Sequence, residues 1–203
     1  MAITVHRGDL PAHVQFSGIV AVDTETLGLK PRRDRLCLVQ LSDGDGSAHI
    51  VQLAAGAYAA PNLKALLADP ETVKLFHYAR FDVAVLKQYL GVVAAPLYCT
   101  KIASKLVRTY TDRHGLKDLV KELLNIDLSK QQQSSDWAAS ELSEAQIAYA
   151  ASDVLHLHAL KAKLDEMLAR EGRAGLAEAA FGFVPVRAEL DLLGFEDDDI
   201  FIH

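Results

Sequence analysis

The sequence predicts an α/β fold in which a mixed central sheet is flanked by helices, within a single domain. Three observations support this prediction. Apolar runs of strand length fill the first half of the chain, apolar residues at helical spacing fill the second half, and 203 residues suffice for one sizeable core. We therefore expect one domain over residues 1–203, with its functional motifs within 19–170 and a C-terminal helix and tail at 174–203.

The predicted strands lie within the first 76 residues. A short edge strand is expected at 2–6, and the apolar run Ile19–Val22 is typical of a buried strand. The runs Leu36–Leu41 and Ala48–Leu53 are separated by a turn rich in Ser, Asp and Gly, which predicts a hairpin. Val73–Phe76 is the last predicted strand.

The predicted helices dominate the second half of the chain. We expect Asn62 to cap a helix that runs through Leu67, and a second helix to run from Arg80 to Gly91. Ser143 and the glutamine three residues later form a capping box, which predicts a helix continuing towards Arg170. Further helices are expected at about 101–109, 115–125 and 174–193, the last kinked or split by Pro185.

Composition narrows the possible functions. A net charge of −6 argues against a protein that coats polyanions, but it permits binding of one short strand end, which needs only a few placed cations. Cys37 and Cys99 lie in apolar surroundings, as reduced core thiols do. The sequence has no apolar run long enough to span a bilayer and no signal-peptide pattern. These features predict a cytoplasmic protein.

Two acids end the strand at Ile19–Val22 and are the first candidate site residues. Asp23 and Glu25 are two residues apart, so on a strand their side chains project from one face. Two carboxylates held so close raise each other's pKa unless a cation lies between them. Mg²⁺ and Mn²⁺ prefer such oxygen ligands. The alternative is a strand end that runs into a solvated turn.

Two further acids are expected near the same place. Asp82 falls in the first turn of a helix that follows a strand, where helix electrostatics alone is an alternative explanation. Tyr149 and Asp153 continue a stripe of leucines on the helix that Ser143 opens, so Asp153 should face the sheet. A buried carboxylate there needs a cation or donors, and a salt bridge to Arg or Lys is the alternative.

Together the four acids predict a metal-dependent phosphodiesterase site. Asp23, Glu25, Asp82 and Asp153 carry four formal negative charges, which two divalent cations about 3.5–4 Å apart would neutralise. Such a site activates water for in-line attack on phosphorus and stabilises the leaving 3′ oxygen. Tyr149, one turn before Asp153, is expected to position that water, because an ordinary tyrosine stays protonated at neutral pH.

The ordered motifs carry a family resemblance. Asp23-x-Glu25, His77-x-Ala79-x-Phe81-Asp82 and Tyr149-x-x-x-Asp153 resemble the three exonuclease motifs of the DEDD superfamily, tyrosine subclass. The polar segment that ends in Ser135-Asp136-Trp137 is similar to that of ribonuclease D. Ribonuclease D proteins carry C-terminal helical domains for which this chain is too short. The chain most resembles the short nano-RNase C branch, the diribonucleotide exonucleases.

This resemblance implies a fold, an activity and an assembly. The implied fold is ribonuclease H-like, as in DnaQ-like exonucleases. The implied activity is 3′→5′ hydrolysis of very short RNA, such as the dinucleotide pGpG, to nucleoside 5′-monophosphates in the last step of RNA degradation. Two Mg²⁺ or Mn²⁺ ions are the implied cofactors, and an octameric ring is the implied homo-oligomer. The implied catalytic residues are Asp23, Glu25, Asp82, Tyr149 and Asp153, with the four acids as metal ligands.

Dinucleotide specificity would require further contacts. Leu27, two residues past Glu25, is expected to wedge between two bases, and cations should cap the 5′ phosphate. For each cation a solvated surface charge is the alternative, and for Trp137 we expect the ring in the core with its backbone near the site. The candidate caps are Arg80, Lys101, Lys105, Arg108, Arg113, His114 and Lys130. The predicted substrate contacts are Thr24, Leu27, His77, Tyr78, Arg80, Phe81, Lys105, Gln133, Ser134, Ser135 and Trp137.

Other functions stay open at the level of sequence. The same chemistry suits ribonuclease D-type trimming of longer RNA 3′ ends, or 3′→5′ degradation of DNA. A non-catalytic nucleic-acid-binding module of the same fold and a metal-dependent phosphatase are more distant alternatives. The tail at 195–203 mixes apolar residues with acids, which indicates either a homo-oligomer contact or a frayed end.

Overall fold

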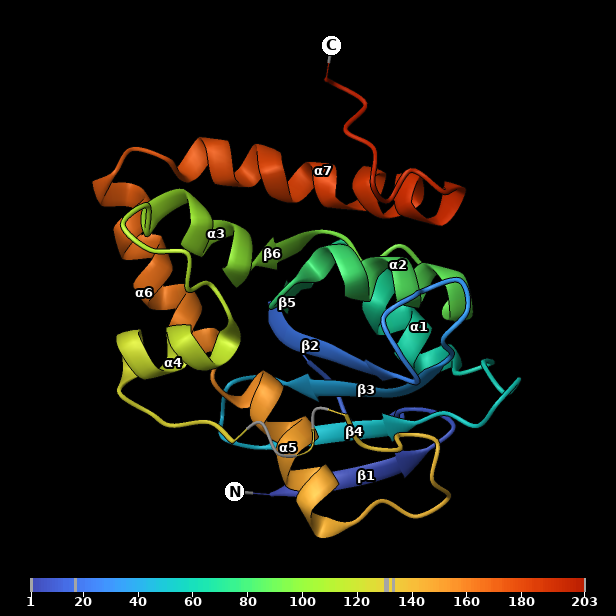
Figure 1. The fold of residues 1–203 in the computed structure, drawn as a ribbon. Helices are drawn as coiled ribbons and strands as arrows, with labels where there is room; N and C mark the ends of the chain where they lie inside the picture. Colours follow the sequence, from blue (N-terminus) through green and yellow to red (C-terminus); the bar gives the residue numbers. More distant parts are fainter. Residues whose placement is uncertain (1, 17, 130–131, 133, 203) are drawn as a thin grey trace.

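Six strands form one mixed sheet in the computed structural model, which describes residues 2–16, 18–129, 132 and 134–202. The strand order is β1-β4-β3-β2-β5-β6 (Figure 1). The pairs β2–β3 and β3–β4 are antiparallel, whereas β1–β4, β2–β5 and β5–β6 are parallel. The strands are β1 Ile3–Arg7, β2 Ile19–Thr26, β3 Leu36–Ser42, β4 Ala48–Gln52, β5 Val73–Phe76 and β6 Leu97–Cys99.

Seven helices are assigned over the same described residues. They are α1 Pro61–Ala68, α2 Ala79–Leu90, α3 Thr100–Val107, α4 Leu116–Leu124, α5 Glu144–Leu155, α6 Leu157–Arg170 and α7 Ala174–Leu193. Helix α5 packs against β1–β4, and α7 lies across α2 and α3 (Figure 1). The predicted mixed sheet with flanking helices is therefore confirmed. No helix of the described chain has both the length and the apolar character to cross a membrane.

The two faces of the sheet bury different apolar clusters. Leu38 and Ile50 pack with Trp137 and Ala150 beneath α5. Val39, next to Leu38 on β3, belongs instead to the main core, to which α2 contributes most of its buried residues. Because side chains alternate along a strand, α5 and α2 cover opposite faces of the sheet. The centre of β2 is thus enclosed from both sides.

The predicted strands are confirmed, with one omission. The runs at 36–41 and 48–53 do form the antiparallel pair β3–β4, and β1 is an edge strand. Strand β6 was not predicted, because three residues are too few to show an apolar period.

Helix α1 is capped from a distance, so the expected cap at Asn62 is wrong. The helix begins at Pro61, and the backbone N–H groups of Asn62 and Leu63 donate to the Asp9 carboxylate at 3.0 and 2.9 Å. A proline suits the first helical position because the N–H it lacks has no partner there. A cap that lies 53 residues away in sequence leaves no local signal.

The expected long helix from Ser143 to Arg170 is two helices. The capping box of Ser143 and Gln146 forms as predicted, but the helix breaks at His156, whose φ and ψ are −106° and −3°. The break occurs where the packing partner changes, since α5 lies on β1–β4 whereas α6 packs against α3, α4 and α7. Pro185, in contrast, does not split α7, which is continuous over 20 residues.

Candidate active site

Strand β2 presents two carboxylates on the face that α5 covers. Val20, Ala21 and Val22 are fully buried, so the strand is held firmly up to Asp23. Asp23 and Glu25 are half-buried and share one face, as their spacing predicted. The strand pairs with β5 only at Ile19–Ala21 and with β3 from Ala21 to Thr26, so both acids lie beside β3 and beyond the end of the β5 pairing.

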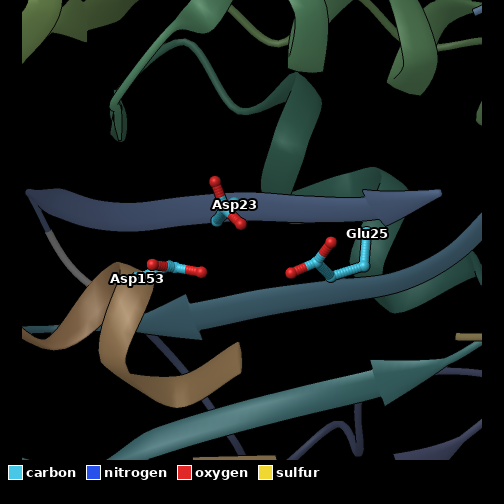
Figure 2. Close-up of side chains that lie close together, drawn as sticks. All are labelled: Asp23, Glu25 and Asp153. Atoms are coloured by element: carbon cyan, nitrogen blue, oxygen red, sulfur yellow. The ribbon is translucent and has the colours of Figure 1, made fainter. Parts of the chain in front are cut away.

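Helix α5 brings a third acid to this pair. One carboxylate oxygen from each of Asp23, Glu25 and Asp153 lies within 4.8 Å of the other two. Figure 2 shows the Glu25 and Asp153 carboxylates turned toward each other, with Asp23 beside them on β2. Among the described residues, no lysine or arginine forms an ion pair with these three acids. We call them the acidic cluster.

The acidic cluster holds its protons tightly. Burial, then repulsion from Asp153 and Asp82, raises the pKa of Glu25 to about 9. Burial also raises the pKa of Asp153 to about 7 and moves the pKa of Asp23 well above its usual value. The three carboxylates lie close together and are costly to ionise without a partner. Such a set of oxygen ligands suits a hard divalent cation. The residues present therefore fit the metal ion that the sequence predicted.

Asp82 lies beside the acidic cluster without joining it. It is in the first turn of α2 and accepts a hydrogen bond of 2.6 Å from the Thr24 hydroxyl. Burial raises its pKa to about 7, and its charge in turn raises the pKa of Asp23. Thr24 is a buried neighbour of Asp82, and its hydroxyl is already engaged.

Tyr149 is one helical turn before Asp153 on α5. Its ring packs against Trp137 with centroids 6.0 Å apart. Burial and the nearby carboxylates raise the pKa of Tyr149, so its hydroxyl stays protonated. Hydrogen bonding from that hydroxyl partly offsets the raised pKa of Asp153. Tyr149 is therefore a hydrogen-bond donor at the edge of the acidic cluster.

The turn between β5 and α2 carries two more predicted residues. The His77 Nδ1 lies 2.8 Å from the Thr100 hydroxyl, and burial lowers the His77 pKa to about 3, so the ring is neutral. Tyr78 has a left-handed backbone with φ of 76° and is 46% exposed. The Lys101 ammonium lies 4.0 Å from the centre of its ring. A non-glycine residue at such a φ is strained, which is common at functional sites.

Several predicted cations are already paired. Arg80 donates to both oxygens of Asp191 at 2.6 and 2.8 Å, which joins α2 to α7. Arg108 is fully buried and pairs with Glu122, so the expectation that it could cap a 5′ phosphate is wrong. Arg113 forms an ion pair with Asp118 at 2.6 Å. These cations stabilise the helical layer.

The other predicted substrate contacts differ in how far they are exposed to solvent. Leu27 is 51% exposed, Lys105 is exposed, and Phe81 packs at the margin of the main core. The ring of Trp137 is buried, as predicted.

The polar segment before α5 is described in part. Ser134 is exposed, and the Ser135 hydroxyl donates to the side chain of Gln132. Gln133 and Lys130 lie outside the described residues.

One polar side chain near the acidic cluster was not predicted. Gln40 is fully buried on β3, in register with Asp23 on β2. A glutamine within the otherwise apolar run Leu36–Leu41 was the signal available in the sequence.

Comparison with known families places this site in a class. A family model described as 3'-5' exonuclease matches residues 9–169, which include all four predicted acids. The chain belongs to this 3'-5' exonuclease family. Ribonuclease D of Gluconacetobacter diazotrophicus is 43% identical over 154 residues, which are 76% of this chain and 39% of that protein. The chain thus spans about two fifths of the length of the curated relative it matches.

Solved structures narrow the class. NrnC of Brucella melitensis bound to pGG is 57% identical, with a TM-score of 0.96 over 100% of this chain and 99% of that one. The same protein with bound Mg²⁺ is 56% identical, with a TM-score of 0.95 and full coverage of both chains. Escherichia coli RNase D is 28% identical, with a TM-score of 0.76 over 85% of this chain and 45% of its own. The chain is a 3′-5′ exonuclease of the RNase D and NrnC type, with the ribonuclease H-like fold that the motifs implied.

Proposed function

We propose that this exonuclease hydrolyses very short RNA, above all dinucleotides, to nucleoside 5′-monophosphates. The observation that carries the proposal is the convergence of Asp23 and Glu25 from β2 with Asp153 from α5. Support for a short substrate comes from the full-length likeness to an NrnC that was solved with pGG. Such an activity would complete RNA degradation by removing the last phosphodiester bond.

The catalytic roles follow from the positions of the side chains. Asp23, Glu25 and Asp153 would hold a divalent cation, and Asp82 would complete a second site beside them. When bound, Mg²⁺ or Mn²⁺ supplies an acidified water and charge stabilisation at the leaving oxygen. Tyr149 orients that water by hydrogen bonding and keeps its own proton.

The substrate contacts follow from exposure and charge. The exposed Leu27 side chain is available to separate two bases, and Tyr78 offers an aromatic surface beside the Lys101 ammonium. The neutral ring of His77, with Phe81 and the polar segment at Ser134 and Ser135, would line the path of the sugar and phosphate.

The 5′ phosphate requires cations that are still available. Lys105 is exposed and pairs with no carboxylate among the described residues, and Lys101 lies one helical turn before it on α3. We assign the phosphate to this pair rather than to Arg80, which Asp191 already engages.

We also propose a homo-oligomer in the cytoplasm. Exposed apolar residues on α7 and in the tail, among them Leu193 and Phe201, suit contact with further copies of the chain, with an octameric ring as the specific expectation. The two cysteines are free and buried, which is consistent with a reducing compartment.

One experiment separates this proposal from its alternatives. Chemically synthesised RNAs of two to twenty nucleotides, 5′-labelled, are incubated with the protein and Mg²⁺ or Mn²⁺, with Asp153→Asn as the inactive control. We expect the dinucleotide to be cleaved fastest, with 5′-monophosphates and no free phosphate as products. Comparable rates at every length would indicate ribonuclease D-type trimming. Binding without turnover would indicate a binding module, and release of phosphate a phosphatase.

A further inference from the structure

Gln40 is a glutamine whose side chain is fully buried. It lies in the middle of β3, and both its amide nitrogen and its amide oxygen are without a partner in the described protein. Its neighbours Val39 and Leu41 are fully buried apolar residues, so the strand does not otherwise need a polar group here. A buried amide without a partner destabilises the fold, so its retention calls for an explanation.

The register of the sheet places this amide next to the acidic cluster. Gln40 is paired with Asp23 on β2 and with Ile50 on β4. Residues directly opposite each other on antiparallel strands project from the same face, with Cβ atoms about 4.5–5.5 Å apart. Ile50 packs beneath α5, the helix that carries Asp153. The Gln40 side chain therefore lies on the α5 side of the sheet, directly beside Asp23.

The chemistry of an amide suits this position. The amide N–H groups are donors, and an ionised carboxylate is an acceptor only. A divalent cation bound by the acidic cluster would hold Asp23 in its ionised form, since an opposite charge favours that form. The ionised Asp23 then needs a donor that keeps its ligating oxygen oriented, and the neighbouring amide is of the right kind.

We propose that Gln40 is a positioning residue that donates a hydrogen bond to the Asp23 carboxylate in the cation-loaded protein. This inference rests on the proposed function, because it assumes that the acidic cluster binds a divalent cation. Gln40 would act through Asp23 and touch neither substrate nor reacting atoms. Among the described residues no other group engages the Gln40 amide, so it is available to that carboxylate.

A pair of matched variants tests the inference without RNA. Gln40→Met keeps the length of the side chain but removes the amide. Gln52→Met is the control, because Gln52 is a glutamine of the adjacent strand β4, in register with Leu38, and its Nε2 donates to the Ala139 carbonyl at 2.9 Å. Mn²⁺ affinity is measured by electron paramagnetic resonance, and the melting temperature is measured in EDTA.

The two variants should behave in opposite ways. For Gln40→Met we expect Mn²⁺ affinity about 10-fold weaker or worse, as is usual for loss of a partner to a metal ligand. Its melting temperature in EDTA should equal or exceed that of the wild type, because no hydrogen bond is lost. For Gln52→Met we expect a lower melting temperature and unchanged Mn²⁺ affinity, because a formed hydrogen bond is lost and Leu38 on β3 separates Gln52 from Glu25 on β2.

The outcomes separate this inference from the proposed function. Unchanged Mn²⁺ affinity in Gln40→Met overturns the inference, as does a lower melting temperature in EDTA that a second variant, Gln40→Leu, reproduces. If the wild type binds Mn²⁺ but cleaves no RNA, the proposed function fails while the titration still decides the role of Gln40. A wild type that binds no Mn²⁺ overturns the inference directly.

Discussion

The carboxyl groups around Asp23 lower the stability of the folded protein when no cation neutralises their charge. Asp82 and Asp153 have pKa values of about 7 and Glu25 of about 9, all raised chiefly by burial. Ordinary carboxyl groups in an unfolded chain ionise near pH 4. At neutral pH the folded protein must therefore either keep protons that the unfolded chain releases or hold negative charges close together. A bound divalent cation would remove both of these costs.

Replacing one of these acids should separate stability from activity. We expect Asp153→Asn to lose at least about 100-fold of the hydrolysis rate, since losing even an indirect partner of a metal ligand costs about 10- to 100-fold. The same variant should melt at a higher temperature in EDTA, because it removes a buried carboxyl group from the acidic cluster.

Melting curves and rates on the dinucleotide check this prediction. Glu166→Gln is the control, because Glu166 is exposed on α6 and pairs only loosely with Lys163 at 3.7 Å. Intact Mn²⁺-supported hydrolysis in Asp153→Asn would remove Asp153 from the catalytic residues.

The raised pKa values also predict a pH dependence. Between about pH 4 and pH 9 the folded protein binds more protons at these carboxyl groups than the unfolded chain does, so their contribution to stability falls as pH rises. We expect the difference in melting temperature between Asp153→Asn and the wild type to grow from pH 5.5 to pH 8.5 in EDTA. Saturating Mg²⁺ should raise the melting temperature of the wild type most at pH 8.5. A difference that is constant with pH would contradict the pKa assignments.

At the scale of elements, a buried lysine ties β5 to its neighbours. The Lys74 ammonium is fully buried and donates to the carbonyl groups of Asp69, Thr72 and Ala95 at 2.6, 2.6 and 2.8 Å. Its three donors thereby join the turn before β5 to the segment that leads into β6. Because β5 pairs with β2, this arrangement also supports the strand that carries Asp23.

Removing this lysine should destabilise the fold. We expect Lys74→Met to lower the free energy of unfolding by about 3 kcal/mol, because three carbonyl groups in buried or part-buried hydrogen bonds lose their donor. Urea unfolding followed by circular dichroism measures the change. Lys117→Met, at an exposed position on α4, should stay within about 0.5 kcal/mol of the wild type. A similar small loss for both variants would show that water replaces the donor at Lys74.

The elements that the sequence predicted well are those with a local signal. The apolar run at β2, the hairpin at β3–β4 and the capping box at Ser143 are each visible within a few residues. The break at His156 and the cap of α1 by Asp9 were not visible, because tertiary packing decides both. A stripe of leucines shows that a helix is buried, but it does not show against which partner.

At the scale of the molecule, α7 and the tail present apolar surface that no described part of the chain covers. Leu176 and Leu193 are 58% and 64% exposed, and the tilted rings of Phe201 and Phe183 pack with centroids 6.0 Å apart. Arg187 holds the tail by donating to the Phe195 and Asp198 carbonyl groups. The surface is thus ordered by contacts within the chain, as an assembly contact should be.

Charge placed on this surface should reduce the assembly. We expect the double variant Leu176→Asp/Leu193→Asp to elute as a smaller species than the wild type in size-exclusion chromatography with light scattering, because apolar contacts tolerate buried charge poorly. Val93→Asp is the control, at an exposed apolar position outside α7 and the tail. An unchanged mass for the double variant, or a monomeric wild type, would contradict the proposed interface.

The sequence predicted those site residues that belong to the ordered motifs. Two motifs far apart in sequence supplied Asp23, Glu25 and Asp153, which the fold brings together. The engagement of Asp82 by Thr24 and the position of Gln40 depend on strand register and on the start of α2. Single positions in a sequence do not show whether a cation is free, so the pairing of Arg108 with Glu122 was missed.

The break at His156 separates two helices that pack against different partners. Helix α5, which carries Asp153, lies on β1–β4, whereas the leucines of α6 pack mainly with the other helices. We therefore expect a substitution that displaces α3, α4 or α7 to move α6 more than it moves α5, which lies on the sheet. Changes in these outer helices should then alter the spacing of the three acids less than changes in α5 or in β1–β4 would.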